Sequence, residues 1–299
     1  MIKIISGYSH SAGSTLALVN LCNEFNSRGY ACIFYGPDSW HVDKCKSGML
    51  VDFVPEAGDS IIVNDIPLLS ISDLSNLNAL LEKSDSKRLL KTLREITFKL
   101  LPSGKSRDYR LFLTLLNDDA LPWSSVRLAL FQKIHFASNA LKKYACTSYP
   151  KFISPSFCND LKKIEHKPTK IAGIIGSIKK HNNIVEAIEQ ALCDGMETVI
   201  IFGYMKDPVY YYDKIVPLTL SHPGKIKYAG FIDYRQKMYD AVSDVYFYAN
   251  KPWSMVSQEC AMTHTRFHTP GSLNADCRMT NDQIFEIWKN ELSLSTGAA

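Results

Sequence analysis

A short apolar strand, a loop of small residues and an amphipathic helix follow one another twice in this sequence. The first set begins at Ile2, passes through SGYSHSAGST and continues as LALVNLCNEFNSRG, whose apolar residues keep helical spacing up to Gly29. The second set begins at residue 170 with KIAGIIGS and continues as NNIVEAIEQALCDG, which stops at Gly195. Strands that alternate with helices predict parallel sheets with helices on both faces. We therefore expect an α/β fold of two Rossmann-like, doubly wound domains.

Length and composition leave room for two such domains. The chain has 299 residues, of which 46% are hydrophobic and 21% charged, as in globular proteins. Residues 150–170 hold three prolines and a lysine-rich patch, which is typical of a linker. We place an N-terminal domain at 1–160 and a C-terminal domain at 161–299, and leave open whether the last helix packs back on the first domain.

Other short apolar segments complete the two sheets. Each is bounded by turn residues or followed by a helical pattern. The predicted strands lie in YACIFYG, DSIIVND, YRLFLTLL, the start of KIHFASNALKKYA, TVIIFG and KIKYAGF.

The cysteines and the N-terminus favour a cytoplasmic protein. Eight cysteines are scattered without a C-x-x-C pair, which favours reduced thiols. The start at Met1 lacks the pattern of a signal peptide, and no apolar run approaches the roughly 20 residues that span a bilayer. The net charge of +4 fits an anionic ligand but does not establish a nucleic-acid partner.

The two loops between strand and helix are candidate phosphate sites. Ligands of parallel sheets bind at the carboxyl ends of the strands, where helix N-termini favour anions. The first loop is 6–15 and the second is 176–183. In the second, a glycine allows close backbone approach, a serine offers a hydroxyl, and two lysines and a histidine supply donors: Gly176, Ser177, Lys179, Lys180 and His181. A solvated basic turn explains the same residues. Neither loop matches the dinucleotide or Walker pattern.

Glu259 begins a predicted helix beside the expected crevice, where a carboxylate can accept bonds from both hydroxyls of a ribose. The neighbouring Cys260, His264 and His268 would line one face of a continuous helix, a possible zinc arrangement. No fourth ligand is evident, and the threonines and Pro270 oppose a long helix, so we predict no metal.

Residues 80–101 predict a basic amphipathic helix with Lys87, Lys91 and Arg94 among its cations. A solvated helix with i,i+4 ion pairs explains this pattern, as does contact with an anionic membrane or a nucleic-acid backbone. The loop 117–123, which opens with Asn117 and Asp118, either reaches an acceptor or packs.

Together these features resemble the retaining glycosyltransferases of the GT-B architecture, in the group of glycogen synthase-like enzymes and of bacterial and phage sugar transferases. The similarity covers most of the chain. The opening segment, IIGSIKKHNNIVEAI, VIIFGYMKDP and KPWSMVSQECAM each resemble a family segment, and the strongest match is GFIDYRQKMYDAVSDVYFY with its spacing to Glu259.

The resemblance implies two domains that face each other across a cleft, with the nucleotide-sugar donor on the C-terminal one. It implies transfer of a hexosyl or pentosyl group from a nucleotide-diphosphate sugar, most simply a UDP-sugar, to an acceptor hydroxyl, with retention and without metal or cofactor. The implied catalytic residues are Lys179, Lys180 and Lys251. The implied donor-binding residues are Gly13, Ser14, Gly176, Ser177, His181, Gly203, Phe231, Ile232 and Glu259.

Three positions depart from the family pattern. Lys251 stands where the family has the first of two glutamates, Ser177 stands where an arginine is usual, and Leu116 and Asn117 stand near the place of a histidine. The acceptor stays open between a hydroxymethylated DNA base and a lipid-linked or polysaccharide acceptor at a membrane surface. A non-catalytic nucleotide-sugar or nucleic-acid binding protein is the alternative to an enzyme. The candidate acceptor residues are His10, Asn117, Asp118, Lys87, Lys91 and Arg94.

Overall fold

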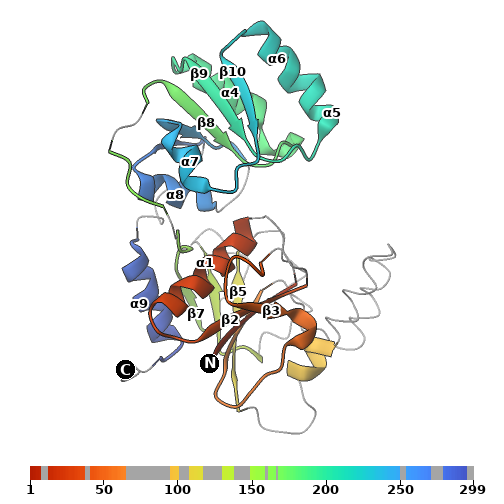
Figure 1. Cartoon of the computed structure of the whole chain (residues 1–299), viewed down its shortest axis with the longest axis vertical. Coiled ribbons are helices and arrows are strands. Elements are labelled where there is room, and N and C mark those ends of the chain that lie inside the picture. Colours follow the sequence, from red (N-terminus) through yellow and green to blue (C-terminus); the bar gives the residue numbers. More distant parts are fainter. Residues whose placement is uncertain are drawn as a thin grey trace. The chain divides into compact units, whose positions relative to one another are not determined.

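The protein is described by a computed structural model that divides into two compact units (Figure 1). Unit 1 comprises Met1–Asn159 and Asn281–Ala299, and unit 2 comprises Asp160–Thr280. The structure describes residues 1–7, 13–37, 41–64, 95–100, 108–116, 130–137, 149–158, 161–165, 168–249, 254–270 and 279–294.

Unit 1 is built on a parallel seven-stranded sheet with the order β3-β2-β1-β4-β5-β6-β7. The order reverses between β1 and β4, as in a doubly wound fold. The strands are β1 Ile2–Ser6, β2 Cys32–Gly36, β3 Ser47–Met49, β4 Ser60–Asn64, β5 Arg110–Leu115, β6 Lys133–Phe136 and β7 Lys151–Ile153. The helices are α1 Gly13–Ser27, the 3₁₀ turn η1 Leu50–Asp52, a helical segment at 95–100 and α9 Asn281–Glu291.

Helix α9 belongs to unit 1 although it follows unit 2 in the sequence. Its buried side chains Phe285 and Trp288 pack edge-on against Phe25 of α1, with ring centroids 5.9 and 6.4 Å apart. Lys133 at the start of β6 forms an ion pair with Glu291 at the end of the helix. The helix therefore completes the core of unit 1.

A row of buried polar side chains crosses the sheet of unit 1 near the carboxyl ends of its strands. Ser6 Oγ donates to Asn64 Oδ1 at 3.3 Å, and Asn64 Nδ2 donates to the Thr114 carbonyl at 3.1 Å. The Thr114 hydroxyl lies 2.7 Å from Nδ1 of His135, and Nε2 of His135 lies 2.9 Å from the Ser154 hydroxyl. The row thus links β1, β4, β5 and β6 to the end of β7 without leaving these side chains unpaired.

Unit 2 is built on a parallel five-stranded sheet with the order β10-β9-β8-β11-β12. The strands are β8 Ile171–Ile175, β9 Thr198–Phe202, β10 Ile226–Gly230, β11 Asp244–Tyr246 and β12 Arg266–His268. The helices are the 3₁₀ turn η4 Lys180–Asn182, α4 Ile184–Cys193, α5 Pro208–Tyr210, the π-helical η5 Tyr211–Ile215, α6 Val216–Ser221, α7 Arg235–Asp240 and α8 Met255–Thr263.

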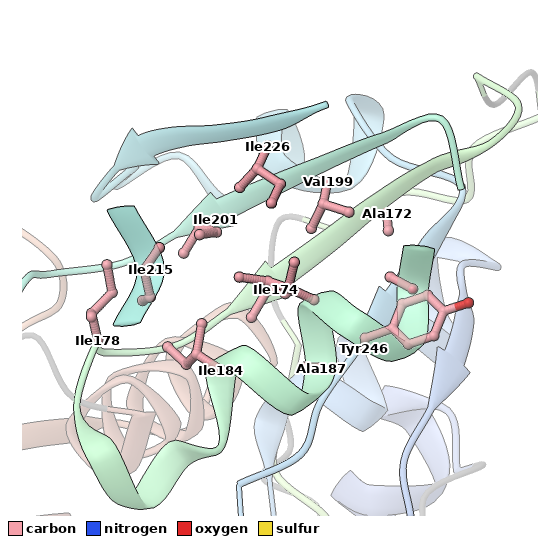
Figure 2. Close-up of a cluster of buried hydrophobic side chains, with 12 residues drawn as sticks. Ala172, Ile174, Ile178, Ile184, Ala187, Val199, Ile201, Ile215, Ile226 and Tyr246 are labelled. Atoms are coloured by element: carbon pink, nitrogen blue, oxygen red, sulfur yellow. The ribbon is translucent and has the colours of Figure 1, made fainter. Parts of the chain in front are cut away.

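Alternating residues of β8 enter two different cores of unit 2. Ala172 and Ile174 pack against the apolar stripe of α4, in which Ile184 and Ala187 face the sheet (Figure 2). Ile175 packs in a second cluster with residues of α7 and α8. Successive strand residues point to opposite faces. Helices therefore cover both faces of the sheet, and the predicted α/β doubly wound class is confirmed.

Several three-residue strands were not predicted, among them β3, β7 and β12. Strand β7 occupies the first residues of the segment 150–170, which the prolines had marked as a linker. Strand β12 lies in the segment that would have had to be helical for the zinc arrangement. Helix α8 ends at Thr263, and His264 adopts a left-handed conformation with φ 57°. Cys260, His264 and His268 consequently share no helix face.

Two kinds of feature are absent from the described ranges. They contain no group of three or more histidine, cysteine or acidic residues arranged to hold a metal ion. Among the helices in those ranges, none combines the length and apolar character required to cross a membrane.

Candidate functional site

Two glycine loops lie backbone to backbone at the carboxyl ends of β8 and β9. Gly176 and Gly203 have φ values of 154° and 146°, a region that favours glycine. The Ile178 N–H donates to the Tyr204 carbonyl at 2.8 Å, and Ile178 forms a β-bridge with Met205. A Cβ atom on Gly203 would overlap the carbonyl group of Gly176. Only glycine fits at position 203 while the two loops stay in contact.

We expect Gly203→Ala to lower the free energy of unfolding by about 2 kcal/mol or more, because both the positive φ and the backbone overlap must be relieved. Gly195→Ala is the matched control, since Gly195 has φ 83° but open space around its Cα. The control should cost only about 1 kcal/mol. Urea unfolding of both variants measures the difference, and equal losses would contradict the overlap.

Two asparagines hold the turn that connects β8 to α4. Asn182 Nδ2 donates to the Ser177 carbonyl at 2.6 Å, and the Asn182 N–H donates to the Lys179 carbonyl at 3.0 Å. Asn183 adopts a left-handed conformation before α4, and its Nδ2 donates to the Tyr248 carbonyl at 3.1 Å. Figure 2 shows this turn between Ile178 and Ile184, both of which point into the core. The turn is therefore fixed at both ends.

Three basic residues lie in this turn, directly before α4. Lys179 is half-buried, whereas Lys180 and His181 are exposed in the 3₁₀ turn. They precede a ten-residue helix whose N-terminal end carries a partial positive charge. The cations and the helix end together favour an anion at this edge of the sheet.

An exposed aromatic pair lies on the loops after β9 and β10. The rings of Tyr204 and Phe231 stack with centroids 4.2 Å apart and planes 12° apart, and the two residues are 41% and 39% exposed. The Tyr228 hydroxyl donates to the Gly203 carbonyl at 2.8 Å, which anchors the adjoining loop. Ile232 packs against the cluster of α7 and α8 instead. The pair offers a flat apolar surface of the kind on which an aromatic ligand stacks.

Glu259 is buried, and both of its carboxylate oxygens accept hydrogen bonds. Its side chain is 1% exposed, and both carboxylate oxygens accept bonds from Nε and Nη2 of Arg235. The Tyr239 hydroxyl donates to Oε2 at 2.5 Å. Burial alone would lower the pKa of Arg235, but the Glu259 carboxylate outweighs burial and the pKa is raised. Burial first, and then Glu259, raise the pKa of Tyr239 well above its ordinary value.

Helix α8, which carries Glu259, begins with a capped N-terminus. The Ser254 hydroxyl accepts from the Val256 N–H at 3.1 Å. One turn later, Gln258 is 1% exposed, and neither polar atom of its side chain has a hydrogen-bond partner among the described residues.

Known glycosyltransferase structures share this architecture at low sequence identity. An alpha-glucosyltransferase (AGT) in complex with UDP matches with a TM-score of 0.59 and 10% identity over 99% of this chain and 90% of that one. HepE of Anabaena, in complex with UDP and glucose, matches with a TM-score of 0.59 and 10% identity over 98% and 99% of the two chains. The chain has the GT-B fold.

A third GT-B structure, AviGT4, a glycosyltransferase involved in avilamycin A biosynthesis, matches with a TM-score of 0.52 and 12% identity over 90% of this chain and 78% of that one. No model of a known protein family matches the sequence, and no curated protein sequence is significantly similar to it.

Within the GT-B fold, the residues predicted for donor binding fall in both units. Gly13 and Ser14 are the first residues of α1 in unit 1. In unit 2, backbone and ring contacts bring Gly176, Gly203 and Phe231 together. Seven predicted residues lie outside the described part of the chain: His10, Lys87, Lys91, Arg94, Asn117, Asp118 and Lys251.

Sequence reasoning missed five residues of this region. Asn182 and Asn183 directly follow the basic residues, and asparagine is common in turns and at helix starts, so a local signal existed. Tyr204 follows the glycine of β9 and is equally visible. Arg235 and Tyr239 lie at i and i+4 on α7. Their contacts with Glu259 join residues that are 24 and 20 positions apart in the sequence, so no local pattern predicts them.

Proposed function

We propose that this chain transfers a hexosyl or pentosyl group from a UDP-sugar to an acceptor hydroxyl. The observation that carries the proposal is the pair of interlocked glycine loops at Gly176 and Gly203, which leads into a cationic turn and lies beside an exposed aromatic pair. That combination offers separate surfaces for a diphosphate and a base. The similarity in fold to structures with bound UDP supports it.

The proposed chemistry places the cations at the leaving group. As the bond between the anomeric carbon and the diphosphate oxygen breaks, negative charge gathers on that oxygen, and fixed cations stabilise it. Lys179, Lys180 and His181 fill this role, and Lys251 is the further candidate. The acceptor oxygen forms the new bond to the anomeric carbon and gives its proton to the departing diphosphate. Attack on the face from which the diphosphate leaves would retain the configuration.

The remaining donor contacts follow from the same geometry. Tyr204 and Phe231 provide the ring surface for the uracil base, and the absence of a side chain at Gly176 lets a phosphate approach the backbone at Gly176 and Ser177 closely. Glu259 was predicted to hold the ribose, but in this structure both of its oxygens are occupied.

A panel of nucleotide diphosphates and UDP-sugars tests the donor. We expect UDP and at least one UDP-sugar to raise the melting temperature and to bind with a measurable Kd by calorimetry. Stabilisation by none of them would refute the donor site. Binding without transfer or hydrolysis across a mixed acceptor panel would favour the non-catalytic alternative.

For the acceptor, we propose a hydroxymethylated base in DNA. A similar structure is an alpha-glucosyltransferase in complex with UDP and a 13-mer DNA containing a HMU base, with a TM-score of 0.59 and 12% identity over 98% of this chain and 90% of that one. The candidate contacts are His10, Asn117 and Asp118 for the base, and Lys87, Lys91 and Arg94 for the phosphates.

We expect labelled sugar to pass from the UDP-sugar to duplex DNA that contains hydroxymethylated pyrimidines, and not to the same duplex with unmodified bases. DNA binding should weaken steeply as salt rises, because phosphate contacts release counterions. Transfer to a lipid-linked or polysaccharide acceptor, with none to the modified duplex, would support the membrane-surface alternative instead.

A further inference from the structure

The carboxylate of Glu259 is buried in this structure, and both of its oxygens already accept hydrogen bonds. It is 1% exposed, and it accepts two bonds from Arg235 and one from Tyr239. For the ribose hydroxyls to bind it, the guanidinium would have to leave a buried, doubly bonded carboxylate. Breaking a buried ion pair is strongly unfavourable.

Arg235, in contrast, has donors to spare. A guanidinium has five N–H groups, and the bonds from Nε and Nη2 to Glu259 leave the Nη1 edge on the side away from the carboxylate. The Arg235 side chain is 25% exposed, so part of it reaches the surface. Arg235 also begins α7 only four residues after Phe231, whose ring belongs to the stacked pair. The guanidinium is thus rigidly held and close in the chain to the proposed base surface.

The charge of the pair indicates which part of a donor it meets. Glu259 neutralises Arg235, so the two side chains act as a neutral unit that presents N–H donors. Such a unit suits uncharged oxygen acceptors, whereas the exposed Lys180 and His181 of the 179–181 turn are basic residues suited to a diphosphate.

We propose that Arg235 contacts the nucleoside part of the donor, through its ribose hydroxyl or base carbonyl oxygens, and that Glu259 and Tyr239 are positioning residues that hold the guanidinium. This rests on the proposed UDP-sugar function and assigns Glu259 a role different from direct ribose contact. The two roles predict opposite effects when Arg235 is replaced.

The test compares calorimetric binding of UDP and of inorganic pyrophosphate to the full chain and to Arg235→Lys. Lysine keeps the charge beside Glu259 but cannot reproduce the side-on pair. We expect the Kd for UDP to rise about tenfold or more, and the Kd for pyrophosphate to stay within about twofold of wild type. A melting temperature close to that of wild type shows that the variant is folded.

A second variant guards against misfolding caused by an unpaired carboxylate. Replacing the cluster together, as Arg235→Met, Tyr239→Phe and Glu259→Leu, removes both charges of the cluster and roughly keeps its volume, which is often neutral for stability. The same selective loss of UDP affinity is expected.

The outcomes separate this inference from the proposed function. If wild type binds neither UDP nor any UDP-sugar, the proposed function fails. If wild type binds UDP and Arg235→Lys binds it equally well or more tightly, Arg235 does not contact the nucleoside and the inference fails alone. If UDP and pyrophosphate lose affinity equally, the assignment of Arg235 to the nucleoside is overturned.

Discussion

Replacing Lys179 and Lys180 together by alanine should lower the rate of sugar transfer on the order of a hundredfold and raise the Kd for UDP about tenfold. The two lysines lie in a turn that Asn182 ties to the Ser177 carbonyl and Asn183 ties to the Tyr248 carbonyl. Because the backbone is fixed, the cations need little rearrangement when charge develops on the leaving group. The loss should therefore be larger in turnover than in UDP affinity.

Lys162→Ala combined with Lys163→Ala is the matched control. Both control lysines are exposed, adjacent and in unit 2, so the change in net charge is the same. Transfer assays and calorimetry at low and high salt should show a loss only for the first pair, with a weaker salt dependence of UDP binding. Equal activity of the two double variants would remove the 179–181 turn from the mechanism.

We also expect unit 1 to lose stability below neutral pH because of the buried His135. His135 is 2% exposed and lies against Trp288 and Phe152, with ring centroids 4.5 and 5.0 Å away. Burial lowers its pKa from 6.5 to about 4, although a bond to the Ser154 backbone acts in the opposite direction. The folded chain therefore keeps this imidazole neutral.

The sign of the pH dependence follows from that lowered pKa. Below pH 6.5 the unfolded chain binds a proton at His135, whereas the folded chain binds it only near pH 4. The contribution of His135 to the free energy of unfolding is therefore fully present above pH 6.5 and is lost as the pH falls from 6.5 to about 4. The difference in pKa corresponds to a loss of about 3 kcal/mol.

Urea unfolding at pH 7.5 and 4.5 measures this loss in wild type and in His135→Asn. Other groups titrate over the same range, so the quantity of interest is the difference between the two pH dependences. We expect a shallower pH dependence for His135→Asn, and a wild-type dependence for His222→Asn, which removes a half-buried histidine of unit 2. Parallel curves for all three proteins would mean that His135 does not control acid stability.

Local sequence patterns predicted most of the architecture because apolar strands and helix-ending glycines are local features. Gly29 and Gly195 do follow α1 and α4, with φ values of 82° and 83°. Strands β7 and β12 were not predicted because each has only three residues, too few to form a recognisable apolar pattern. Strand β12 is held by long-range bonds from Arg266 and His268 to Asp244, which no short window contains.

In the candidate site, too, local features could be predicted from the sequence and long-range contacts could not. The cationic turn at Lys179 and Lys180 was visible as a glycine followed by basic residues at a helix start. The surroundings of Glu259 were not visible, because its partner Arg235 is 24 residues away and only the packing of α7 against α8 brings them together. The sequence therefore indicated the Glu259 carboxylate but not the Arg235 guanidinium that donates to both of its oxygens.

The split composition of unit 1 has a consequence for how the protein matures on the ribosome. Phe285 and Trp288 complete the core of this unit, yet they are translated after all of unit 2. The first 159 residues would thus emerge with the α9-facing side of Phe25 and His135 uncovered, while unit 2 can fold as a continuous segment. The order of completion during synthesis would then be the reverse of the order of the sequence, with the N-terminal unit finished last.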